Sequence, residues 1–284
     1  MGKLEKNIYK ITWPILVEML FFTLLGTVDT VMLSRFSDTA VGSVGVSNGI
    51  LFLFGIIVNV IALGIGVVAA QYLGAKKVQK AKDTVVTGIA GNFIIGIVLS
   101  TVVVILGKSL LEMIGTNSIF MEDSVTYIRI VGLSLVFIAI RVAISNGFRS
   151  FGKPKVVMYI MIIGNLVNIA INAVLIYGLF GLPRLGVQGA AIGTVVSRII
   201  MVAILGISAY KILDIKILKV RLHLVQLKKI LFVGIPAATE NLMWNIAQVF
   251  IMAIINQLTP EAVIARTYIY TILSFIFIFS FSFA

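Results

Sequence analysis

Eight stretches of this chain are apolar and long enough to cross a lipid bilayer, which takes about 20 consecutive residues in a helix. They lie at about 8–34, 44–73, 84–107, 125–147, 156–180, 187–210, 229–257 and 263–284. Backbone groups in hydrocarbon must form their hydrogen bonds internally, which a helix does within one segment. The sequence therefore predicts an all-α, polytopic membrane protein.

The composition leaves no room for a soluble domain. Of the 284 residues, 60% are hydrophobic and 12% are charged, against about 45–50% and 25% in a soluble globular chain. The chain has no cysteine and one histidine, and it has no glycine-rich phosphate loop, nucleophile elbow or metal-ligand cluster. We therefore predict no enzymatic activity, no catalytic residue, no metal site and no bound cofactor.

The lysines and arginines are distributed unevenly over the connections between spans. Sixteen of the 23 lie at the N-terminus or in the second, fourth and sixth connections, whereas four lie in the first, third, fifth and seventh. Because cytoplasmic loops carry the excess of positive charge, we expect the N-terminus and the Lys76–Lys82 loop in the cytoplasm. We predict a multi-pass protein of the plasma (inner) membrane, whose basic loops contact anionic lipid and not nucleic acid.

The first span carries two carboxylates, Glu18 and Asp29. An ionisable side chain in hydrocarbon is costly, so its presence indicates a functional role. The two acids are 11 residues apart, which places them on one face of a helix at depths that differ by roughly 16 Å. This face is the first candidate for ion coupling.

The first span recurs late in the sequence. A shift of 222 residues places Pro14 on Pro236 and Glu18 on Glu240, and many transporters are built from such repeats. We therefore divide the chain into an N-terminal six-helix lobe, residues 1–221, and the first two helices of a second lobe, residues 222–284. A complete pair of repeats needs roughly 440–450 residues at this period. We thus expect a four-helix C-terminal segment to be missing, and no efflux from the 284 residues without it.

Two further sets of polar residues lie inside the spans. Asn165, Asn168 and Asn172 form a single stripe on the fifth span, which either joins helices by hydrogen bonds or lines a path for an ion or substrate. Arg198 lies near the middle of the sixth span and needs a partner. Since Glu18 also lies near mid-span by residue count, we predict that these two side chains form an ion pair.

Four stretches resemble, in order and spacing, segments of the multidrug and toxic compound extrusion (MATE) family. They read PILVEMLFFTLLGTVDTVMLSRF, AQYLGAKKVQKAKDTVVTG, SNGFRSFGKPK and GVQGAAIGTVVSR. The resemblance implies two six-helix bundles that form a V around a central cavity. It also implies secondary active export of small organic, often cationic and amphipathic compounds in exchange for Na⁺ or H⁺.

The resemblance also bears on individual residues. Asp29, in the sequence VDTVM, is the first choice for an acid that binds either the coupling cation or the substrate. Some members carry an aspartate where this chain has Asn172. Some sodium-coupled members have a glutamate one turn past Glu240, at Trp244, so that acid is matched only loosely by Glu240. Trp244 either binds an organic cation with its ring face or faces lipid.

Two alternatives to a multidrug antiporter stay open at the level of the sequence. A flippase for a lipid-linked substrate would need basic residues in its cavity to hold pyrophosphate, and few basic residues lie mid-span. A scaffold or inactive fragment that transports nothing is the other alternative.

Overall fold

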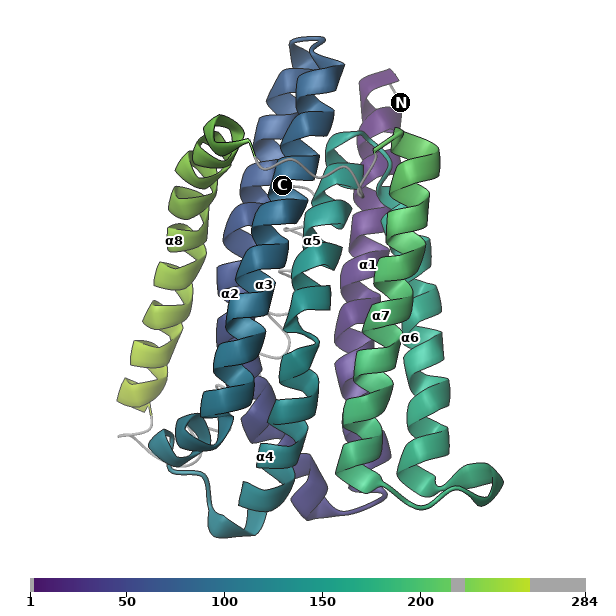
Figure 1. Cartoon of the computed structure of the whole chain (residues 1–284), viewed down its shortest axis with the longest axis vertical. Helices are drawn as coiled ribbons and strands as arrows, with labels where there is room; N and C mark the ends of the chain where they lie inside the picture. The colour runs from purple at the N-terminus through teal and green to yellow at the C-terminus, as the bar shows by residue number, and fades with distance from the viewer. Residues whose placement is uncertain (1–2, 216–222, 256–284) are drawn as a thin grey trace.

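The computed structural model describes residues 3–215 and 223–255, and these form an elongated bundle of helices without strands (Figure 1). The helices are α1 (Lys3–Ser34), α2 (Asp38–Gly74), α3 (Val78–Met113), α4 (Ser118–Leu133), α5 (Leu135–Ser150), α6 (Pro154–Tyr177), α7 (Gly186–Leu213) and α8 (Leu224–Ile255), with a short 3₁₀ turn, η1 (Leu179–Gly181). The predicted all-α fold is confirmed.

Most of these helices have the dimensions of membrane spans. Thr12–Ser34 of α1, α2, α3, α6 and α7 are each long and apolar enough to cross a membrane, and α4 with α5 makes a sixth span if the pair is counted as one. The first six predicted spans therefore match the observed helices. The seventh corresponds to α8, whereas the eighth, at 263–284, and the proposed boundary at 221/222 lie outside the described residues.

The fourth predicted span is a broken helix, not the continuous helix that the sequence suggests. Its halves, α4 and α5, meet at Ser134 with a bend of 45°. The Ser134 hydroxyl donates to the carbonyl of Val131 at 2.6 Å and accepts from the guanidinium of Arg198 on α7. A serine that bonds to the backbone of its own helix competes with the regular hydrogen-bond ladder and bends it. The hydrogen bond between Arg198 and Ser134 therefore joins α7 to the middle of this span, at the break.

Small residues bring α8 close to α2, and Figure 1 shows the two helices side by side. A Cβ atom on Gly64 of α2 would overlap the carbonyl oxygen of Ile230, and one on Gly234 of α8 would overlap that of Val60. Close packing of membrane helices through such residues is general. The packing role of the glycine-rich second span is thus confirmed at Gly64, whereas Gly45 has open space around it.

Candidate functional site

A polar cluster lies between α1, α6 and α7, around the carboxylate of Asp29. The Asn172 amide donates to Asp29 Oδ1 at 2.9 Å and to Asn168 Oδ1 at 3.0 Å. The Asn168 amide in turn lies 3.4 Å from the hydroxyl of Ser197 on α7. We call these four residues the Asp29 cluster. Its carboxylate and amide oxygens are the kind of ligand that hard cations prefer.

A small residue on α7 makes room for this cluster. A Cβ atom on Gly193 would overlap Asn172 Oδ1, and one on Gly189 would lie 2.7 Å from the backbone of Leu175. The GxxxG pattern of α7 is therefore a close-packing motif, and it also shapes the space around Asn172. Asn172 Oδ1 is buried without a hydrogen-bond partner among the described residues.

The asparagine stripe joins helices by hydrogen bonds, and its second suggested role, lining a path for an ion or substrate, stays a prediction. All three side chains are buried, in accord with one polar face. Asn165 joins helices, since its amide donates to the carbonyl of Phe21 on α1 at 3.0 Å. Asn168 and Asn172 belong to the Asp29 cluster. Asn165 thus bonds to the backbone of α1, whereas Asn168 and Asn172 bond to other polar side chains.

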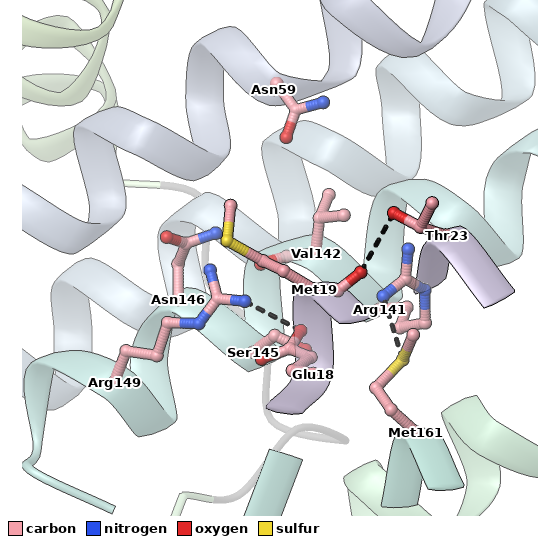
Figure 2. Close-up of a pocket in the computed structure, with 10 residues that line it drawn as sticks. All are labelled: Glu18, Met19, Thr23, Asn59, Arg141, Val142, Ser145, Asn146, Arg149 and Met161. Carbon is pink, nitrogen blue, oxygen red and sulfur yellow. Dashed lines mark hydrogen bonds and ion pairs between the residues drawn. The ribbon is translucent and has the colours of Figure 1, made fainter. Parts of the chain in front are cut away.

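A second site is a cavity of about 300 Å³ between α1, α2, α5 and α6. Figure 2 shows Glu18 of α1 and Arg149 of α5 joined across it, with an N–O distance of 2.7 Å. Glu18 is only 5% exposed. Polar side chains of Asn59, Ser145 and Asn146 also line the cavity, together with Arg141 and the apolar or thioether side chains of Val142, Met19 and Met161. We call this space the Glu18 cavity.

The predicted ion pair between Glu18 and Arg198 is wrong. Glu18 pairs with Arg149, and Arg198 donates to the Ser134 hydroxyl at the break between α4 and α5. Residue count had placed Glu18 and Arg198 at similar depths, but α5 supplies the basic residue that faces Glu18. Asp29 and Glu18, expected on one helix face at two depths, accordingly serve two separate sites.

Sequence reasoning missed the basic lining of the Glu18 cavity. The predicted span at 125–147 leaves Arg149 outside it and Arg141 near its end, yet both side chains line the cavity from α5. The available signal was their spacing, because Arg141, Ser145 and Arg149 follow each other at four-residue intervals on one helix face. The side chains of Glu240 and Trp244, the candidates on α8, lie outside the described residues.

These features define a multi-pass membrane protein with buried ionisable side chains in its helical core. Comparisons with known proteins name the family. The family model described as MatE matches residues 14–174. The transporter YisQ of Bacillus subtilis, which carries no assigned substrate in its name, is 36% identical over 277 residues, covering 96% of this chain and 61% of YisQ. The probable multidrug resistance protein NorM of Thermotoga maritima is 26% identical, covering 86% of this chain and 53% of NorM. This chain belongs to the MATE family.

Solved structures agree in fold. A multidrug resistance MATE family transporter in an outward-facing conformation superposes with a TM-score of 0.84 at 22% identity, covering 99% of this chain and 63% of that one. The family consists of secondary transporters and not of enzymes, as predicted. The flippase alternative is not favoured by these comparisons. The chain spans about half to three fifths of the length of the first relatives it matches.

Proposed function

We propose that this chain acts in a secondary antiporter that exports small organic compounds, often cationic and amphipathic, in exchange for Na⁺ or H⁺. The observation that carries the proposal is the hydrogen bond between the half-buried carboxylate of Asp29 and the buried amide of Asn172, within a membrane-spanning segment. A carboxylate there is costly unless it binds something. Family membership and the position of Asp29 on α1 support its assignment as the coupling acid.

The chemistry of the Asp29 cluster suits this role. The Asn172 amide nitrogen donates its two N–H groups to Asp29 and Asn168. The oxygen atoms of these side chains remain as candidate ligands for a cation. In a low-dielectric site a carboxylate binds one cation strongly and a second poorly, because the first neutralises it. Coupling ion and cationic substrate therefore compete for Asp29. An inward gradient of the coupling ion can then drive the substrate out of the cell.

The wider setting follows from the same proposal. The protein lies in the plasma membrane with a cytoplasmic N-terminus, and its two lobes enclose a central substrate cavity. Residues 1–221 form the first lobe, and α8 belongs to the second. The partners are small organic molecules and membrane lipid, not nucleic acid.

The test is dye efflux from lipid vesicles that contain this chain together with a separately encoded segment of four further C-terminal helices, driven by an imposed Na⁺ gradient or by a pH gradient. We expect an amphipathic cationic dye to move with one of the two gradients, and Asp29→Asn to abolish that movement. Asp38→Asn is the matched control, because Asp38 is an exposed acid at the start of α2 and should not matter. Undiminished transport in Asp29→Asn, at equal protein content, would remove Asp29 from the mechanism.

A further inference from the structure

The Glu18 cavity carries an excess of positive charge in the part of the chain that the structure describes. It is lined by two arginines and one carboxylate. Glu18 is matched by Arg149 at 2.7 Å, whereas Arg141 has no carboxylate within ion-pair distance among the described residues. Its only hydrogen-bond partner there is the thioether sulfur of Met161 at 3.3 Å, a weak acceptor. One guanidinium in the cavity thus lacks a counter-charge.

The polar groups around Arg141 are also incompletely paired. Glu18 Oε2, Ser145 Oγ and Arg149 Nε are buried and have no partner among the described protein atoms. Ser145 is 2% exposed and lies one helical turn from both arginines on α5. Unpaired buried polar atoms are rare in native proteins, and they are expected where a ligand completes the network.

We propose that the Glu18 cavity is a binding site for a small organic monocarboxylate, held by the guanidinium of Arg141 and the hydroxyl of Ser145. The net charge of the cavity favours a single negative charge over a doubly charged phosphate. The planar fork of arginine matches a carboxylate with two parallel hydrogen bonds. Arg149 offsets the charge of the Glu18 carboxylate through Oε1, so the net positive charge of the cavity remains on Arg141.

The walls of the cavity fit the rest of such a ligand. Its volume of about 300 Å³ lies at the lower end of small-molecule sites, which is too roomy for a lone halide ion. Met19, Val142 and Met161 provide the apolar side, and methionine packs readily against rings of varied shape. The ligand is therefore an acid with a compact apolar or aromatic body.

The proposal is tested by equilibrium dialysis of radiolabelled benzoate against the purified full chain in detergent. We expect saturable binding that weakens by about tenfold or more in Arg141→Gln, because a charge-assisted hydrogen bond is lost. Arg129→Gln is the matched control, since Arg129 is exposed on α4 and should leave binding unchanged. The affinity of Arg141→Lys for benzoate should lie between those of the unchanged chain and Arg141→Gln, because lysine keeps the charge but lacks the planar pair of N–H donors of arginine.

A second measurement does not depend on how well the Arg141 variants fold. The chain has no cysteine, so Asn146→Cys places a single thiol on the cavity wall, and benzoate should slow its alkylation by a maleimide at least fivefold. Equal protection by chloride or by inorganic phosphate at the same concentration would overturn the carboxylate assignment, as would the absence of any protection. Asp29→Asn should leave benzoate binding intact, which separates this site from the proposed coupling site.

Discussion

Replacing Glu18 and Arg149, singly and together, tests the pairing that the structure makes in the Glu18 cavity. The two side chains are buried to different extents. That of Glu18 is 7% exposed and that of Arg149 is 33% exposed, and they are 2.7 Å apart. Loss of Arg149 leaves a carboxylate stranded in the core, whereas loss of Glu18 leaves a guanidinium that water can still reach.

The structure sets the order of the expected effects. Removing one member of a buried pair lowers the free energy of unfolding by about 3–5 kcal/mol, and we expect Arg149→Gln to reach this range. For Glu18→Gln we expect about 1–2 kcal/mol, because partial exposure of Arg149 reduces the penalty. The double variant avoids any stranded charge, so it should lose less than the two single changes added together. The coupling energy should be about 2 kcal/mol.

The assay is unfolding in mixed micelles with a rising fraction of denaturing detergent, followed by circular dichroism of the helices. Lys108 and Glu112 provide the control pair, since they are exposed, lie 3.8 Å apart and should couple by less than about 0.5 kcal/mol. A cycle between Glu18 and Arg198 should likewise show no coupling. The reasoning fails if Glu18 couples to Arg198 as strongly as to Arg149, or if the Glu18–Arg149 coupling equals that of the exposed pair.

Two further predictions concern the Asp29 cluster and the topology. Gly193→Ala should displace Asn172, lower the free energy of unfolding by about 1–3 kcal/mol through overpacking and abolish gradient-driven dye efflux. Gly45→Ala is the control, because its position has open space around it, and it should change neither measurement. A membrane-impermeant maleimide applied to intact cells should label Arg35→Cys but not Lys77→Cys, and the reverse pattern would invert the assigned topology.

Local patterns in the sequence were sufficient for the architecture. A helix in lipid is specified by the length and hydropathy of one segment, because its backbone hydrogen bonds stay within that segment. The number and order of the spans from α1 to α7 could therefore be predicted, with boundary errors of up to about seven residues, but the break at Ser134 could not. The polar face of α6 could be predicted for the same reason, since Asn165, Asn168 and Asn172 follow the helical period. The four stretches that resemble MATE proteins also sufficed to name the family.

Only the tertiary structure decided which charged side chains meet. Glu18 and Arg198 share a depth by residue count, yet contact also depends on which helices are neighbours and how each is rotated about its axis. The break at Ser134 engages Arg198, and the face of α5 that carries Arg149 turns toward Glu18. The sequence by itself thus determined the helices, the family and the candidate acids. Their partners, and the cavity around Glu18, arise from the packing of α1 against α6, which brings Glu18 within reach of Arg149 on α5. Contacts between distant segments leave no periodic signal in any one of them.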